Sequence, residues 1–289
     1  MKNFKLCLGT AQFGLNYGIN NQKGKISHEE IFELLNYAHN NGISTIDTAS
    51  AYGNSEAVLG ETITRLNKNF KITSKYPVNT EIRPFQWIDT SLERLKTEKV
   101  YGYLFHNFSI FREHPDYIDD FLKIKEEKKA EKTGFSLYYP SEAEYILKNN
   151  IPCDIIQIPY NIFDQRFACL FPDLKNKGIE IYARSVFLQG LFFIEPDKLD
   201  KRFDSVRKLI KKIHNTAKDN SVNIAALCLN FVNSNKNISY IIIGVDSVSN
   251  LEENISNYAN LGALKISYPD FLQFALTDED IILPFNWQK

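Results

Sequence analysis

Short apolar runs alternate with longer amphipathic segments along most of the chain. The runs lack the strict alternation of apolar and polar positions seen in half-exposed strands, and buried parallel strands have this character. Eight strands are therefore predicted, at about residues 4–8, 43–47, 70–74, 101–105, 133–137, 154–158, 179–183 and 240–243.

Segments with helical periodicity follow these strands. Two of them begin with a capping box, Ser27 with Glu30 and Ser141 with Glu144, in which a hydroxyl and a carboxylate satisfy the first free backbone N–H groups. Helices are predicted at about residues 27–41, 55–65, 86–96, 116–129, 141–148, 165–176, 201–220, 224–233 and 248–258.

Eight strand–helix units predict an α/β fold, a closed (β/α)8 or TIM barrel. An open doubly wound sheet is the alternative. It is less favoured because Gly9, Gly14 and Gly18 do not have the G-x-G-x-x-G spacing of a dinucleotide-binding turn. We expect a single domain over residues 1–289, in which residues 265–289 form a covering C-terminal tail.

Composition narrows the class of protein. The 289 residues are 44% hydrophobic and 24% charged, as in ordinary globular proteins, and 34 basic against 35 acidic residues give a net charge of −1. This balance gives no electrostatic footprint for nucleic acid or an anionic membrane. No apolar run reaches the roughly 18 residues of a membrane span, and the N-terminus lacks a signal-peptide core. Four scattered cysteines and no C-x-x-C pair favour a cytoplasmic protein with reduced thiols.

Candidate chemistry lies where three strands end. Asp47, Lys75 and His106 end the second, third and fourth strands, and Tyr52 follows Asp47 by five residues. The carboxyl ends of barrel strands open on one face, so we expect these side chains to be neighbours there. The alternatives are a turn-capping Asp, a surface Tyr and a core His bonded to backbone. The other histidines, His28, His39, His114 and His214, have no ligand spacing, so no metal site is expected.

The segments LGTAQFG, DTASAYGNSE, ITSKYP and LFH, in this order, resemble the aldo-keto reductase family, and the resemblance runs from about Leu6 to Asn260. It implies NAD(P)H-dependent reduction of a small carbonyl substrate, an aldehyde or ketone that includes sugar-like compounds, to an alcohol by hydride transfer. The implied catalytic residues are Asp47, Tyr52, Lys75 and His106.

The implied roles make physical sense. Tyr52 would give the proton, but an unperturbed phenol titrates near 10 and is a poor acid or base at neutral pH. A nearby Lys75 ammonium is expected to lower the pKa of Tyr52, and Asp47 to hold Lys75 charged and in place. His106 would hydrogen-bond the substrate carbonyl and fix its orientation.

The resemblance also implies a cofactor site, with Ser136 and Gln157 on the nicotinamide amide, although Leu137 replaces the family's Asn. Arg184 stands where an aromatic residue commonly stacks on the ring; its planar guanidinium can stack or pair with phosphate. The implied cofactor-binding residues are Ser136, Gln157, Arg184, Ser185, Phe187, Gln189, Gly190, Gly244, Asp246, Ser247 and Asn254.

The sequence does not point to one cofactor, NADP or NAD, as strongly as it does in some family members. Gly244 and Asn250 stand where NADP-preferring members have Lys and Arg, and Asp246 adds a negative charge. NADP is expected as the working cofactor, with NAD usable. Another departure is that few residues precede the first strand, so we expect no hairpin of the kind that often closes the barrel bottom.

Two other functions stay open. One is a nicotinamide-binding regulatory subunit with slow turnover. The other is a barrel hydrolase, aldolase or lyase in which Lys75 forms a Schiff base. The substrate pocket is expected to be lined by aromatic groups and amides, from Phe13, Leu15, Tyr17, residues 107–111, Tyr160, Phe163 and the C-terminal tail. Nothing in the sequence indicates an oligomeric state.

Overall fold

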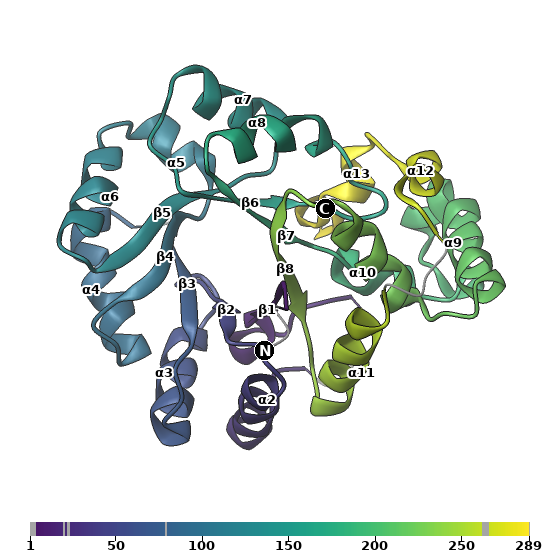
Figure 1. Ribbon diagram of the computed structural model, residues 1–289, viewed down its shortest axis with the longest axis horizontal. Coiled ribbons are helices and arrows are strands. Elements are labelled where there is room, and N and C mark those ends of the chain that lie inside the picture. The colour runs from purple at the N-terminus through teal and green to yellow at the C-terminus, as the bar shows by residue number, and fades with distance from the viewer. Residues whose placement is uncertain (1–3, 20, 22–23, 79, 262–265, 289) are drawn as a thin grey trace.

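Eight parallel strands form the centre of the molecule. The computed structural model describes residues 4–19, 21, 24–78, 80–261 and 266–288. Each strand pairs with the next in sequence order, and β8 closes onto β1, which confirms the predicted (β/α)8 barrel (Figure 1). The strands are β1 (Leu6–Gly9), β2 (Thr45–Asp47), β3 (Lys71–Tyr76), β4 (Val100–Phe105), β5 (Ala130–Ser136), β6 (Ile155–Pro159), β7 (Glu180–Arg184) and β8 (Ile238–Gly244).

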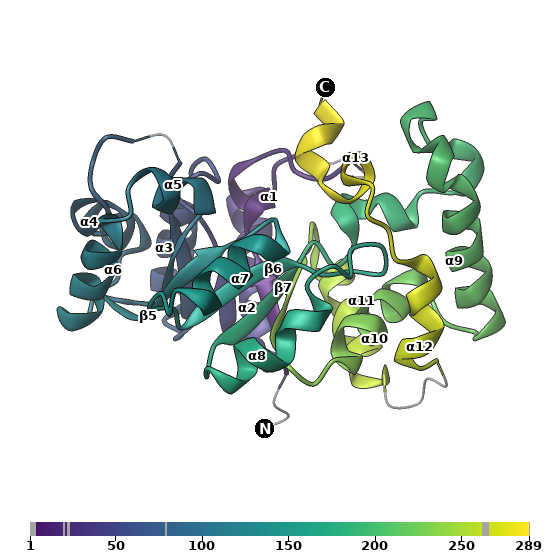
Figure 2. The same cartoon turned by 90° about the horizontal axis from the view of Figure 1, so that it is seen from above.

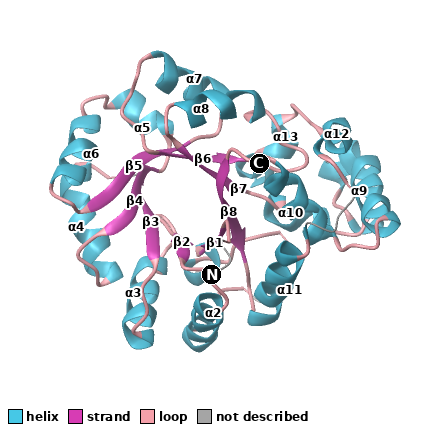
Figure 3. Cartoon of the chain, in the orientation of Figure 1, coloured by secondary structure: helices cyan, strands magenta, loops and turns pink. Residues whose placement is uncertain are grey.

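Helices surround the ring of strands, as Figure 3 shows by colour. Those between or before strands are α1 (Ala11–Gly14), α2 (His28–Asn40), α3 (Ser55–Leu66), α4 (Pro84–Leu95), α5 (Phe108–Glu113), α6 (Tyr117–Glu126), α7 (Pro140–Lys148), α8 (Phe171–Asn176), α9 (Arg207–Asp219) and α10 (Ile224–Ser234). After β8 come α11 (Val248–Ala259), α12 (Tyr268–Phe271) and α13 (Glu279–Ile282).

The sequence of α2 explains how such a helix docks. Its Ser27–Glu30 capping box is present, which confirms the predicted start. Ile31, Leu34 and Leu35 recur at helical spacing and are fully buried against the barrel. Burying each of these side chains contributes roughly 1.5–3 kcal/mol, so the apolar stripe fixes which face of the helix turns inward.

Several local predictions were wrong, and two of them have a clear physical cause. The helix α7 begins at Pro140 and not at Ser141, because proline suits the first helical position and Glu142 accepts the backbone N–H groups of Tyr138 and Tyr139 at 2.7 and 3.0 Å. The short α5 was not predicted at all, since its six residues are too few to show periodicity. Its start is fixed by the Asn107 side chain, which caps the helix.

The two ends of the barrel are covered differently. Figure 2 shows the N-terminal end on one side and the C-terminal segment with α13 on the other. That segment is held by Leu276 N–H donating to the Phe163 carbonyl at 2.8 Å. Only Phe4 and Lys5 precede β1 in the described part, and they form no hairpin. A single domain over residues 1–289 with a tail from 265 stays a prediction, and residues 1–3, 265 and 289 lie outside the described residues.

Within the described ranges, no helix is long and apolar enough to cross a membrane.

Candidate active site

A buried ion pair lies at the carboxyl ends of β2 and β3. Lys75 Nζ is 2.8 Å from both carboxylate oxygens of Asp47 and 2.8 Å from the Thr48 carbonyl oxygen. The two charged side chains are 1% and 4% exposed. The three N–H bonds of the ammonium therefore each have an acceptor, and a lysine held this way cannot swing freely.

The Tyr52 ring stands beside this pair on the turn before α3. Lys75 Nζ lies 5.2 Å from the ring centroid, and the ring meets His106 edge to face at 5.7 Å. Gly14 makes room for the turn, since a Cβ there would lie 1.7 Å from the Tyr52 carbonyl oxygen. The structure thus brings together four residues that the sequence holds up to 59 positions apart, from Asp47 to His106.

The Tyr52 phenol is protonated at neutral pH. Burial raises its pKa well above the usual value, the Asp47 charge raises it further, and Arg184 opposes both. The sequence reasoning expected Lys75 to lower this pKa. The difference arises first from burial of the phenol; in addition, the N–H groups of Lys75 are bonded to Asp47 and Thr48, and the Asp47 carboxylate acts on the phenol. Tyr52 therefore carries a proton at neutral pH, and the raised pKa makes the phenol a weaker acid than a free tyrosine.

The His106 imidazole is neutral. Burial, helped by the charges of Lys75 and Arg184, lowers its pKa to about 3. Its Nδ1 is buried and has no hydrogen-bond partner among the described residues. An orphaned acceptor is tolerated more readily than an orphaned N–H, so the tautomer with the proton on Nε2 is favoured. A neutral Nε2–H can donate a hydrogen bond to a carbonyl oxygen.

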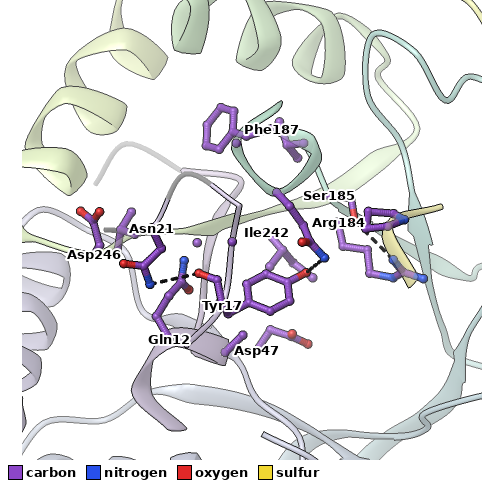
Figure 4. Close-up of a pocket in the computed structure, with 18 of the residues that line it drawn as sticks. Gln12, Tyr17, Asn21, Asp47, Arg184, Ser185, Phe187, Ile242 and Asp246 are labelled. Atoms are coloured by element: carbon purple, nitrogen blue, oxygen red, sulfur yellow. Dashed lines mark hydrogen bonds between the residues drawn. The ribbon is translucent and has the colours of Figure 1, made fainter. Parts of the chain in front are cut away.

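A cavity of about 750 Å³ opens beside these residues and is lined by Asp47, Tyr52 and His106. This volume is typical of small-molecule and cofactor sites. All the predicted cofactor residues line it except Ser247, whose hydroxyl caps α11 by accepting Asn250 N–H at 3.3 Å. Figure 4 shows Asp246 and Asn21 on one side of the cavity and Arg184 on the other, with Tyr17 between them.

The loop after β7 is strained. Ser185, Leu188 and Gln189 have φ of 57°, 46° and 52°, which residues other than glycine rarely adopt. Such conformations cluster at ligand clamps. The loop reaches the segment after β1, because Ile19 N–H donates to the Gln189 carbonyl at 3.1 Å and Gln189 Nε2 donates to the Tyr17 hydroxyl at 3.3 Å. These contacts bridge two walls of the cavity.

Arg184 turns toward the cavity and not toward the barrel bottom (Figure 4). Its Nη2 donates to the Leu137 carbonyl at 3.0 Å, and its guanidinium lies 4.3 Å from the centroid of the Tyr138 ring. It is the one Lys or Arg side chain that lines the cavity within the part of the chain that the structure describes. A cation held by a carbonyl and a ring is available to an anionic or planar ligand.

The other end of the cavity also has unused polar capacity. Asn254 is 3% exposed, and its Oδ1 has no hydrogen-bond partner within the described segments. Gly244 leaves room there, since a Cβ would approach the Gln12 carboxamide to 3.1 Å. A buried acceptor without a partner at a cavity wall is the kind of group that a ligand donor satisfies, so these residues fit a polar nucleotide.

The expected substrate pocket was partly wrong. Phe13, Tyr160 and Phe163 are fully buried in the core, because each packs on neighbouring apolar groups and none lines the cavity. Tyr17 does line it, as do Pro284 and Phe285 of the C-terminal tail.

Sequence reasoning missed several polar lining residues, namely Gln12, Asn21, Tyr138, Asn223 and Glu253. A usable signal existed for Asn223, which caps α10 with its side chain and so had to lie at a loop–helix junction facing the strand ends. Among the described residues, no group of three or more His, Cys, Asp or Glu side chains is placed to hold a metal ion.

The chain also matches a known protein family over most of its length. Residues 5–268 match the model of the aldo/keto reductase family, and the chain therefore belongs to that family. Aldo-keto reductases are oxidoreductases that generally use nicotinamide cofactors.

Individual relatives are distant. The chain is 25% identical over 262 residues to an L-galactose dehydrogenase of Arabidopsis thaliana, covering 83% of this chain and 82% of that protein. It is 24% identical over 248 residues to the uncharacterized oxidoreductase YqkF of Bacillus subtilis (strain 168), covering 77% and 80%. The fold is similar to that of the aldo-keto reductase AKR11C1 from Bacillus halodurans in its holo form, with a TM-score of 0.75, 17% identity and coverage of 94% and 92%.

Proposed function

We propose that this chain reduces an aldehyde or ketone to an alcohol, with a nicotinamide nucleotide as hydride source and Tyr52 as proton donor. The observation that carries the proposal is the convergence of Asp47, Tyr52, Lys75 and His106 beside one cavity. The protein is proposed to act in the cytoplasm on a small molecule, without nucleic acid, membrane or metal.

The chain's own residues divide the work of the reduction. The bound cofactor supplies a hydride to the carbonyl carbon. His106 Nε2–H orients the carbonyl oxygen, and the protonated Tyr52 hydroxyl gives that oxygen a proton. Asp47 and Lys75 position the phenol. Because the His106 imidazole is neutral, it places no positive charge beside the substrate oxygen.

The cofactor is proposed to lie along the cavity. Ser136, Gln157 and Arg184 would hold its nicotinamide end, and the loop from Ser185 to Gly190 its middle. Gly244, Asp246, Ser247 and Asn254 would hold the other end. NADPH is proposed as the working cofactor with NADH usable, since the first turn of α11 can receive phosphate while Asp246 repels it. The ratio of the two kcat/KM values is then below about 100, which is under 3 kcal/mol.

A sugar-like substrate is favoured within the carbonyl class. Tyr17, Tyr138 and Phe285 supply aromatic faces to the cavity, and Gln12, Asn21 and Gln189 supply amide groups. The relative from Arabidopsis thaliana is named for a sugar, which supports the same class. A matched panel of aldehydes and aldoses, assayed with both nucleotides by loss of the reduced-cofactor absorbance, tests the proposal. Absence of turnover across the panel with both nucleotides contradicts it.

The lysine-based alternative is disfavoured. Lys75 is fully buried and its Nζ contacts Asp47 and Thr48, whereas a Schiff base needs a free amine within reach of the substrate. Borohydride trapping of a carbonyl compound on Lys75 would reverse this conclusion. A single burst of cofactor oxidation without steady turnover would instead indicate the regulatory subunit.

A further inference from the structure

One hydrogen bond crosses the barrel interior. Gln157 Nε2 lies 2.7 Å from Asp47 Oδ1, and the two residues are 1% and 3% exposed. They come from β6 and β2, which stand opposite each other in the ring of eight strands. Because an ionised carboxylate only accepts, the amide nitrogen and not the amide oxygen must face it. A buried bond to a charged acceptor is among the strong hydrogen bonds of a protein.

The bond completes the surroundings of the carboxylate. Asp47 has Lys75 at 2.8 Å from both oxygens and Gln157 at 2.7 Å from one of them. Lys75 in turn stands over the Tyr52 ring. A displacement of Asp47 is therefore passed to Lys75 and then to Tyr52, and Gln157 is the contact on the far side that prevents it.

Gln157 also faces the cavity, together with Tyr52 and its strand neighbour Ser136. One carboxamide thus contacts the carboxylate and borders the ligand space. We propose that Gln157 is a positioning residue for the proton donor, which fixes Asp47 and, through Asp47 and Lys75, sets Tyr52 for proton transfer. This inference rests on the proposed function for the identity of the donor, although the contact itself does not.

Several ionisable groups surround this contact and respond to a change in it. They are Cys7 on β1, Lys75 on β3, Tyr52 on the turn after β2, His106 after β4 and Arg184 on β7. Burial raises the pKa of both Cys7 and Tyr52, and the charge of Asp47 raises both further. The charge of Asp47 therefore acts on the phenol, and the hydrogen bond from the Gln157 amide reduces this effect.

Two substitutions separate positioning from simple cofactor contact. Gln157→Met keeps the length of the side chain and removes the donor, and we expect kcat to fall tenfold or more while cofactor affinity, measured by fluorescence titration, changes less. Gln157→Glu places a second carboxyl group against Asp47, where the pair must share a proton. We expect its kcat to fall as pH rises through the neutral range, where we expect a flat profile for the wild type.

Ser136→Ala is the matched control, because Ser136 pairs with Gln157 in the sheet and lines the same cavity. It should alter cofactor affinity and leave the shape of the pH profile unchanged. A Gln157→Met enzyme with kcat within twofold of wild type, or a Gln157→Glu enzyme with the wild-type profile, overturns the inference.

A second readout needs neither cofactor nor substrate. In the apo protein, the shared proton raises the pKa of the carboxyl pair in Gln157→Glu above its unfolded value. This variant should therefore lose stability relative to Gln157→Met as pH rises from about 5 to about 8. Parallel stability curves overturn the inference even if the wild type reduces carbonyl compounds. Divergent curves in a chain that reduces none keep the Gln157–Asp47 coupling and reject the proposed function instead.

Discussion

The barrel carries a lysine, a carboxylate and a tyrosine at each end of its strands. At the carboxyl ends these are Lys75, Asp47 and Tyr52, and at the amino ends they are Lys132, Glu180 and Tyr101. The residue types nearly match, yet the two clusters differ in enclosure. The charged side chains are 1% and 4% exposed at the carboxyl ends, and 31% and 21% exposed at the amino ends.

The tyrosines differ in the same way. The Tyr101 hydroxyl donates to Glu180 at 2.9 Å, and its pKa is raised to about 12, by burial first. Its proton is thus engaged by the protein itself. Tyr52 faces a cavity beside a neutral His106. Residue types alone therefore do not define the proposed proton donor; room for a ligand and exclusion of water do.

The largest expected effect separates the two tyrosines. Tyr52→Phe should abolish steady-state reduction, to less than about a tenth of wild-type turnover, while leaving cofactor affinity nearly unchanged, because the phenol acts only on the substrate oxygen. Tyr101→Phe should keep turnover near the wild-type value, because it removes a hydroxyl at the other end of the barrel.

Steady-state kinetics on one aldehyde and a cofactor titration measure both variants. Comparable losses in the two enzymes would show that the phenols act through stability and not through chemistry. A Tyr52→Phe enzyme that retains more than about a tenth of turnover would remove Tyr52 from the proposed role.

Sequence reasoning predicted the fold and the proximity of four candidate residues for a definite reason. Apolar runs that end in Asp47, Lys75 and His106 indicate both a buried strand and the polar residue at its carboxyl end. It failed where tertiary packing decides the outcome. The pKa of Tyr52 depends on its burial and on the nearby Asp47 charge, and the Gln157 contact joins residues that are 110 positions apart. Neither is visible in a local pattern.

The two ion pairs should differ in their contribution to stability. Asp47→Ala leaves the Lys75 ammonium buried without its partner, and such breaks cost about 3–5 kcal/mol of unfolding free energy. Glu180→Ala breaks a partly exposed pair, for which about 1 kcal/mol or less is expected. Denaturant unfolding of the apo variants at one pH measures both, and equal losses would show that enclosure does not set the difference.

The two cations should differ in ligand binding. Arg184→Ala is expected to weaken nicotinamide nucleotide binding about tenfold, which is about 1.4 kcal/mol, because the guanidinium lines the cavity and is proposed to stack or pair with the cofactor. Lys132→Ala should bind as the wild type does, since Lys132 pairs with Glu180 at the amino ends. Fluorescence titration measures the cofactor affinity of both variants, and unchanged binding by Arg184→Ala would refute the cofactor contact.

The smallest expected effect is on how the unfolding free energy changes with pH in the acid range. Only the cluster at the carboxyl ends of the strands should show it. The pKa of His106 is lowered to about 3 in the folded protein and is near 6.5 in an unfolded chain. Between these values the unfolded state binds the extra proton, so unfolding free energy must fall as pH falls, by up to about 1.4 kcal/mol per pH unit from this group. His106→Asn should flatten the curve between pH of about 6.5 and about 5 by roughly that amount. Tyr101→Phe, whose hydroxyl does not titrate there, should keep the wild-type slope. Identical slopes in His106→Asn and the wild type would mean that the imidazole takes up its proton without unfolding, and the neutral hydrogen-bond donor proposed for the carbonyl oxygen would then be lost.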